Sequence, residues 1–179
     1  KNIIGNLVGG GAEAMIKKAY NFLGIKIPPK KMNLLIKDFL YFYYKNCTRK
    51  SYLYDKIEGS LRLLSRDFKI GLCTNKKQDL TEKILHHFKL DKYFNLVVGS
   101  TPALKLKPDV EMLEYSLEHL GAKAENSVMI GDSSNDIIPA KKLGMKSIFV
   151  SYGFGNLKKP DQADFSVKRF SEIIKIIGA

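Results

Sequence analysis

Residues 127–137 read Ser127-Val128-Met129-Ile130-Gly131-Asp132-Ser133-Ser134-Asn135-Asp136-Ile137 and decide the fold. An apolar strand runs into a turn, and we expect a helix from about Asp136 to Leu143. Asp132 and Asp136 stand on either side of this turn, where both can approach one ion. Mg²⁺ prefers one or two carboxylates completed by water and substrate oxygens, so the pair predicts a magnesium site. The structural alternative is a turn-forming aspartate with Asn135 or Asp136 as the helix N-cap.

The alternation of strand and helix extends over residues 55–179. Apolar strands are expected at residues 68–73, 96–98, 127–130 and 147–150, and helices at about 80–88, 110–120, 136–143 and 170–177. Strands that alternate with helices at this spacing form right-handed βαβ units and a parallel sheet. We therefore predict an α/β fold with a Rossmann-like parallel sheet over residues 55–179.

Residues 1–54 contain helical patterns only. One apolar stripe, of residues 12, 16, 19 and 23, has the period of a helix, and a second helix follows Pro28-Pro29 with a stripe of residues 35, 39 and 42. The aromatic run Tyr41-Phe42-Tyr43-Tyr44 continues this second helix, and we expect it to pack rather than to stack on nucleic-acid bases. The sequence thus predicts a small helical domain ahead of the α/β core.

The composition is that of a globular protein. The chain has 179 residues, of which 45% are hydrophobic and 27% charged, enough to bury a core. It lacks the run of about 18 apolar residues that a membrane helix needs, and its first residues do not form a signal peptide. Cys47 and Cys73 do not form a disulfide framework or a metal cluster. We expect a soluble cytoplasmic protein with no membrane partner.

The net charge of +12 comes almost entirely from lysine. The chain has 26 Lys and 4 Arg against 18 acidic residues, and no lysine run is longer than two. Proteins that read nucleic acids favour Arg, whose planar fork matches phosphate and guanine edges. We therefore predict a solvated basic surface and no nucleic-acid partner. A third interpretation, a positive potential that attracts a small anionic substrate, stays open.

Polar residues follow the other predicted strands, where ligands of parallel sheets bind. Thr74 and Asn75 follow the first strand and offer neutral groups for a phosphoryl oxygen, although both are also ordinary turn and cap residues. Lys107 precedes Pro108, which we expect to restrict its backbone and to open a helix, although the lysine could equally lie at the surface. Together with the carboxylate pair, these residues suit a phosphoryl group and its metal ion.

In this order, Thr74-Asn75, Lys107-Pro108 and residues 131–136 resemble the second, third and fourth motifs of the haloacid-dehalogenase superfamily. Residues 7–12 and Tyr152-Gly153 resemble segments of the phosphoglycolate phosphatases within it, and the resemblance covers nearly the whole chain. It implies a Rossmann-like core, with residues 1–54 as part of an α-helical cap inserted after the first strand. It also implies Mg²⁺ as cofactor and hydrolysis of a small phosphomonoester by a monomer or homodimer.

The resemblance also implies roles for individual residues. Thr74 would bind the phosphoryl group of a small phosphorylated metabolite together with Asn75, and Lys107 would neutralise the charge of that group and of the nucleophile. Asp132 would ligate Mg²⁺, and Asp136 would support the site through the metal or a water molecule. Thr74, Lys107 and Asp132 are the predicted catalytic residues.

One motif of the superfamily has no counterpart here. Its chemistry needs Asp-x-Asp-Gly-Thr at the end of the first strand, where one Asp attacks phosphorus and forms an aspartyl-phosphate and the other is general acid and base. The 179 residues contain no Asp-x-Asp. We expect the missing piece before Lys1 and with it the central strand, whose loss leaves apolar faces and two strand edges uncovered. The chain could be a fragment of a longer product, a sequence stripped of part of its chain, or a decayed gene. Alone it should be inactive.

Other functions are kept as alternatives. A catalytically inert member of the fold could bind a phosphorylated ligand or a protein. A dehalogenase is a weaker third choice, because displacement of a carbon–halogen bond does not need the metal-binding carboxylates. Cys73 is not followed by a Cys-x5-Arg phosphate loop, so we expect it to be a strand residue rather than a nucleophile. His86, His87 and His119 lack the spacing of metal ligands.

Overall fold

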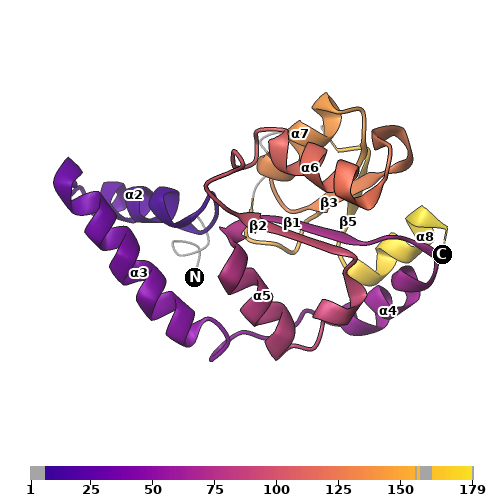
Figure 1. The fold of residues 1–179 in the computed structure, drawn as a ribbon, viewed down its shortest axis with the longest axis horizontal. Helices are drawn as coiled ribbons and strands as arrows, with labels where there is room; N and C mark the ends of the chain where they lie inside the picture. The colour runs from indigo at the N-terminus through magenta and orange to yellow at the C-terminus, as the bar shows by residue number, and fades with distance from the viewer. Residues whose placement is uncertain (1–6, 156, 158–162, 179) are drawn as a thin grey trace.

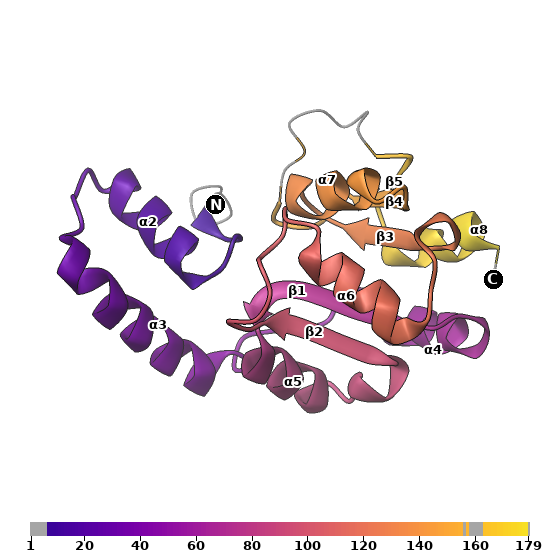
Figure 2. The same ribbon diagram turned by 45° about the horizontal axis from the view of Figure 1, so that its top comes forward.

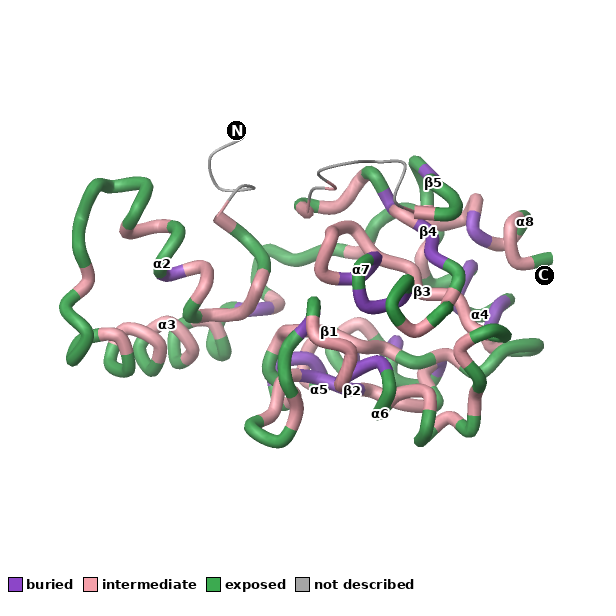
Figure 3. Tube along the Cα trace, turned by 90° about the horizontal axis from the view of Figure 1, so that it is seen from above, coloured by how far each residue is buried: buried purple, intermediate pink, exposed green. Residues whose placement is uncertain are grey.

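The computed structural model of the chain describes residues 7–155, 157 and 163–178. Two helices, α2 (Ala12–Phe22) and α3 (Met32–Asn46), pack on each other and lie to one side of an α/β part (Figure 1). The buried residues are concentrated in the α/β part, whereas the α2–α3 pair is mostly exposed or half-buried (Figure 3). The expected division of the chain into a helical domain of residues 1–54 and a core of residues 55–179 stays a prediction.

The helical pair follows its predicted apolar stripes only in part, because Leu23 at the end of the first stripe lies beyond α2 and is 63% exposed. Ile16 is buried in α2, but α3 buries none of its residues, and Tyr41, Phe42 and Tyr44 are 55%, 63% and 44% exposed. The expectation that the whole aromatic run packs is therefore wrong, because α3 packs mainly on α2 and leaves these three rings largely exposed. Lysine ammonium groups cover three rings instead, in the pairs Lys45–Tyr41, Lys76–Tyr43 and Lys83–Tyr44.

The α/β part alternates strands and helices as predicted. Its strands are β1 (Gly71–Lys77), β2 (Leu96–Ser100), β3 (Val128–Gly131), β4 (Lys146–Val150) and β5 (Phe165–Val167). Its helices are α4 (Ile57–Asp67), α5 (Gln78–His87), α6 (Glu111–Leu120), α7 (Ser134–Lys142) and α8 (Ile173–Ile177), with short 3₁₀ turns at Pro29–Lys31, Asp91–Tyr93, Ala124–Asn126 and Phe170–Glu172 along the chain. All strand pairs are parallel, which confirms the predicted class.

The strands form two groups rather than one continuous sheet. β1 pairs with β2, between α5 on one face and α6 on the other, and β3, β4 and β5 form a second parallel group (Figure 2). The first strand starts at Gly71 rather than at residue 68, and its ladder is interrupted between Cys73 and Lys77. β5 escaped prediction because three residues are too short to show an alternating pattern.

A cavity separates the two groups of strands. Within residues 7–155, 157 and 163–178, β1 pairs only with β2 and β3 only with β4, so each has one unpaired edge. The cavity between these edges, which we call the interstrand cavity, measures about 580 Å³. Apolar side chains from both strands and from the neighbouring helices line it, among them Leu61, Leu72, Leu113, Met129 and Ile130. The cavity thus lies between two strand edges that are unpaired among the described residues, and the expected loss of a central strand stays a prediction.

The hydrophobic core is divided in the same way. One cluster, around Leu61 and Leu85, packs under β1 and β2, and the other, around Ile148 and Ile173, packs under β4 and β5. Phe170 packs against both clusters. No helix among the described residues is long and apolar enough to cross a bilayer.

Candidate active site

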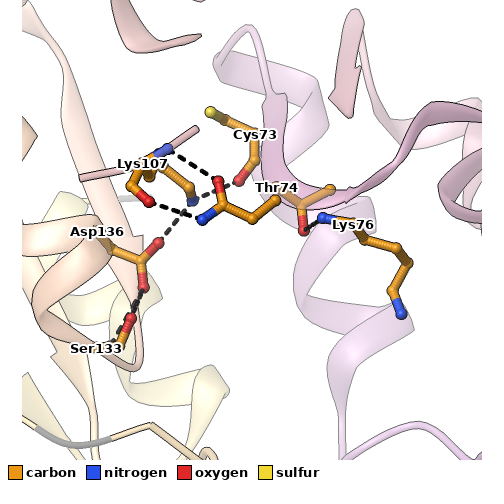
Figure 4. A network of polar contacts seen from close by, with 7 residues as sticks. Cys73, Thr74, Lys76, Lys107, Ser133 and Asp136 are labelled. Atoms are coloured by element: carbon orange, nitrogen blue, oxygen red, sulfur yellow. Dashed lines mark hydrogen bonds and ion pairs between the residues drawn. The ribbon is translucent and has the colours of Figure 1, made fainter. Parts of the chain in front are cut away.

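A buried ion pair joins the two groups of strands at their carboxyl ends. Lys107, in the loop after β2, places its Nζ atom 2.6 Å from Asp136 Oδ1 and donates a hydrogen bond of 2.7 Å to the carbonyl oxygen of Cys73 (Figure 4). Lys107 and Asp136 are only 6% and 8% exposed, respectively. Because Cys73 belongs to β1 and Asp136 to the first turn of α7, one ammonium group bridges the interrupted sheet.

Lys105 lies in the same loop but outside the site. Its ammonium group pairs with Glu111, and its side chain is 70% exposed. The structure therefore separates the two lysines, with Lys107 inward and Lys105 at the surface, and the catalytic role of Lys107 stays a prediction. The expected helix start at Pro108 is wrong, because residues 108–110 form a turn and α6 begins at Glu111.

Asn75 holds the backbone of Lys107. Its Nδ2 atom donates to the Lys107 carbonyl at 2.7 Å, and its Oδ1 atom accepts from the Lys107 amide at 2.9 Å. These two bonds attach the loop after β2 to the end of β1, so the side chain of Asn75 positions the lysine. Its predicted contact with a phosphoryl group stays a prediction.

Thr74 lies beside Asn75 in the interrupted part of the β1 ladder. Its Oγ1 atom accepts a hydrogen bond of 3.2 Å from the amide of Lys76, and its side chain is half-buried (Figure 4). An irregular strand end re-aims side chains, and such irregularities are common next to active sites. The structure thus brings Thr74 to the same edge as Lys107.

Asp136 helps to cap the start of α7 and pairs with Lys107 at the same time. Its Oδ2 atom accepts bonds from the amide and the hydroxyl of Ser133, at 3.2 and 2.9 Å, while Oδ1 faces Lys107. Ser133, not Asn135 or Asp136, is therefore the N-cap of α7, and Asp136 completes a capping box. Gly131 makes room for this geometry, since a Cβ atom there would lie 2.2 Å from the Asp136 Cβ.

Asp132 is held by the loop that follows β4. The amides of Phe154 and Gly155 both donate to its Oδ2 atom at 3.0 Å, which fixes the rotation of the carboxylate. A Cβ atom at Gly153 would lie 2.3 Å from the Asp132 side chain, so only glycine fits this approach. Tyr152-Gly153 stands out in the sequence through the family resemblance, which does not reveal this role. Phe154 and Gly155 do not stand out in the sequence, apart from the second glycine two residues after Gly153.

The donor set suits Mg²⁺ better than a transition metal. The described residues contain no group of three or more His, Cys, Asp or Glu that could hold a metal ion. Mg²⁺ needs only one or two protein carboxylates, because water and substrate phosphate complete its octahedron. Asp132 at the strand end fits this requirement. Asp136 already faces Lys107 and Ser133, so its role as a second ligand stays a prediction.

Two further titratable groups near the site, Cys73 and Tyr152, are neutral at pH 7. Burial raises the pKa of the Cys73 thiol, and the nearby Lys107 opposes this rise. Burial, with smaller effects of Tyr54 and Asp132, raises the pKa of Tyr152 to about 12. Neither group is an anion that could act as a nucleophile at pH 7. His86 and His119 are exposed and paired with Asp91 and Tyr115, away from the strand ends.

Comparisons with known proteins point to one family. The sequence profile described as Haloacid dehalogenase-like hydrolase matches residues 10–150. A phosphoglycolate phosphatase of Colwellia psychrerythraea (strain 34H) is 34% identical over 86% of this chain and 70% of its own length. A phosphoglycolate phosphatase of Agrobacterium fabrum (strain C58) is 32% identical over 83% of this chain and 64% of its own length.

Solved structures agree with this likeness. The chain superposes with a TM-score of 0.87 on a predicted phosphoglycolate phosphatase from Haemophilus somnus 129pt, at 24% identity, covering 98% of this chain and 81% of that one. A predicted phosphatase from Clostridium acetobutylicum superposes with a TM-score of 0.82 at 29% identity, covering 97% of this chain and 79% of the other. The α/β fold with its parallel strands is therefore a known one.

Proposed function

The chain belongs to the haloacid dehalogenase-like hydrolases, and we propose that it acts as a Mg²⁺-dependent phosphatase on a small phosphomonoester of the phosphoglycolate kind. One observation carries the proposal: the buried Lys107–Asp136 pair lies at the carboxyl ends of β1 and β3, with Thr74 and Asp132 at the same edge of the strands. A fixed ammonium, a hydroxyl and a carboxylate are what a phosphoryl group and its metal ion require.

Each residue has a defined task in this proposal. The Thr74 hydroxyl donates to a phosphoryl oxygen, and the Lys107 ammonium neutralises charge that builds up on the phosphoryl group. Asn75 keeps Lys107 in place through its two backbone hydrogen bonds. Asp132 would hold Mg²⁺, which supplies further positive charge to the phosphoryl oxygens. Asp136 fixes the lysine, and its additional contact with the metal or with water is part of the proposal.

The nucleophile belongs to a strand outside residues 1–179 in this proposal. An aspartate oxygen attacks phosphorus, the bond to the substrate oxygen breaks, and water then hydrolyses the aspartyl-phosphate. Two observations support this placement: the chain has no Asp-x-Asp, and the interstrand cavity separates the edges of β1 and β3. A parallel strand in this cavity would end beside Lys107.

The name of the substrate rests on the relatives, which are called phosphoglycolate phosphatases. The structure adds that the glycine loop before α2 reaches the site. A Cβ atom at Gly11 would lie 3.8 Å from the Asn75 carbonyl oxygen and 3.5 Å from Leu106. The helical part of the chain therefore contacts the loops that would surround the substrate, which supports a small phosphorylated metabolite rather than a macromolecule.

The test uses the protein extended by an aspartate-bearing strand. Phosphate released from 2-phosphoglycolate should depend on Mg²⁺, and Lys107→Met and Asp132→Asn should each lower the rate by about two orders of magnitude. Phosphate binding that requires Lys107, without any turnover in the extended protein, would instead favour an inert phospho-ligand binding protein. That second candidate is supported by the buried Lys107 ammonium group together with the absence of Asp-x-Asp from the 179 residues.

A further inference from the structure

The linker between the helical part and the core touches the loop that follows β4. Tyr54, in the linker between α3 and α4, donates its hydroxyl hydrogen to the Tyr152 carbonyl oxygen at 3.3 Å. Their rings meet edge to face with centroids 4.8 Å apart. This contact joins residues 98 positions apart and is a direct connection between the cap linker and the core loop.

The loop that follows β4 also binds the Asp132 carboxylate through hydrogen bonds. The three residues after Tyr152 are Gly153, Phe154 and Gly155, and the last two donate their amides to Asp132 Oδ2. A Cβ atom at Gly155 would lie 2.6 Å from the Asp132 carbonyl oxygen, so the loop also lies against the backbone there. An unbroken series of contacts thus runs from the linker through Tyr54 and Tyr152 to the carboxylate.

We propose that Tyr54 and Tyr152 are positioning residues that fix the orientation of the Asp132 carboxylate according to the position of the cap linker. The inference rests on the proposed function in one respect only, namely that the Asp132 carboxylate binds a metal ion. Movement of the linker away from the core breaks the Tyr54–Tyr152 contact, loosens residues 153–155 and frees the rotation of Asp132. Contact between linker and core holds the carboxylate in one orientation.

Local packing alone does not account for this contact. Tyr54 is 43% exposed, so its ring is not part of a core that needs it for burial. Its hydroxyl group donates a hydrogen bond to the carbonyl oxygen of Tyr152, which directly precedes the residues that contact Asp132. Tyr52, two residues earlier in the same linker, is 85% exposed, and no described contact joins its side chain to that loop. The two tyrosines form a matched pair for an experiment.

Amide hydrogen exchange at Phe154 and Gly155 in the 179-residue protein tests the proposal without metal or turnover. Tyr54→Ala should speed exchange of these two amides by about tenfold, the factor expected from losing one hydrogen bond and one ring contact. Tyr54→Phe, which keeps the ring, should give a smaller rise, and Tyr52→Ala none. Asp132→Ala marks the rate of the released loop, and the Ile148 amide in β4 reports on global opening.

The outcomes separate cleanly. Faster exchange confined to Phe154 and Gly155 supports the proposal. Unchanged exchange in Tyr54→Ala, or a rise shared equally by Ile148, overturns it. If Tyr54→Ala fails to fold, Tyr54→Phe decides by the same comparison. Because no substrate is present, failure of the phosphatase assay would leave this result standing, and failure here would leave the proposed function standing.

Discussion

The stability of the folded protein should depend strongly on the buried Lys107–Asp136 ion pair. Both groups are nearly inaccessible to water, so neither charge can be solvated if its partner is lost. Deleting one partner of a buried pair costs about 3–5 kcal/mol, because the remaining charge is left uncompensated. Lys105 offers a matched control in the same loop, exposed and paired only at the surface.

We expect Lys107→Ala to lower the free energy of unfolding by about 3 kcal/mol or more, whereas Lys105→Ala, at an exposed side chain, should leave it almost unchanged. Urea denaturation followed by circular dichroism measures both. Equal effects of the two substitutions would show that the buried pair does not hold the two groups of strands together.

Asp132 and an exposed aspartate differ in what their removal should do to metal binding. Asp132→Asn should weaken Mg²⁺ activation of the extended protein by about tenfold or more, because a ligand carboxylate is lost. Asp67→Asn, at the exposed end of α4, should leave the Mg²⁺ titration unchanged. Asp161, a surface control that sequence alone suggests, lies outside the described residues. Coincident titrations of the Asp132 and Asp67 variants would remove Asp132 from the metal site.

At the scale of elements, the turn from β3 into α7 depends on a missing side chain. Gly131→Ala places a Cβ atom into the Asp136 side chain and should destabilise the protein by about 1–3 kcal/mol. Gly59 in α4 has open space around it, so Gly59→Ala should stabilise the protein by about 0.5–1 kcal/mol. Thermal unfolding of both variants checks the pair, and a stabilising Gly131→Ala would contradict the described turn.

The link between β4 and β5 should depend on pH. Asp164 accepts bonds from the amide and hydroxyl of Ser147 at 2.9 and 2.7 Å, and these bonds hold the pKa of its carboxyl group below the usual value. A lowered pKa in the folded state contributes stability above the unfolded value of about 3.9, and that stability is lost as the pH falls below it. The Tm difference between wild type and Asp164→Asn should therefore be largest at neutral pH and vanish in strong acid. A difference that grew with acidity would contradict this assignment.

The sequence predicts those features that arise from residues close together in the chain better than those that depend on distant contacts. β2, β3 and β4 follow from short apolar runs between helical patterns, whereas the catalytic role of Lys107, inferred from its place before a proline, stays a prediction. The exposed aromatic face of α3 was mispredicted because periodicity reveals an apolar face but not whether anything covers it. The contacts of Tyr54 and Asn75 join residues 98 and 32 positions apart, so no local pattern could reveal them.

At the scale of the whole molecule, the interstrand cavity explains why the core is divided. In the proposed function, a strand inserted in this cavity would offer hydrogen-bonding partners to both free edges, at the usual spacing of about 4.8 Å, and would cover apolar side chains. β1 and β3 run parallel to their own partners, which favours an inserted strand of the same direction. The residues that should face phosphate and metal lie where such a strand would end. Under the proposed function, one inserted strand would therefore complete both the sheet and the site.

The 179-residue chain alone should show no turnover of p-nitrophenyl phosphate, because it supplies no aspartate at the point of attack. Phosphate release would be measured with and without Mg²⁺, using Asp132→Asn as the control for contaminating phosphatases. Turnover by the chain that Asp132→Asn abolishes would overturn the assignment of the nucleophile to another segment.

Two synthetic peptides can separate completion of the sheet from completion of the site. Both carry five apolar, β-branched residues, followed by Asp in one and Asn in the other. Either should raise the Tm of the 179-residue chain, because strand pairing and apolar burial do not depend on the last residue. Only the Asp peptide should permit phosphate release. No Tm shift with either peptide would show that the cavity does not accept a strand, and equal turnover with both would show that the inserted residue is not the nucleophile.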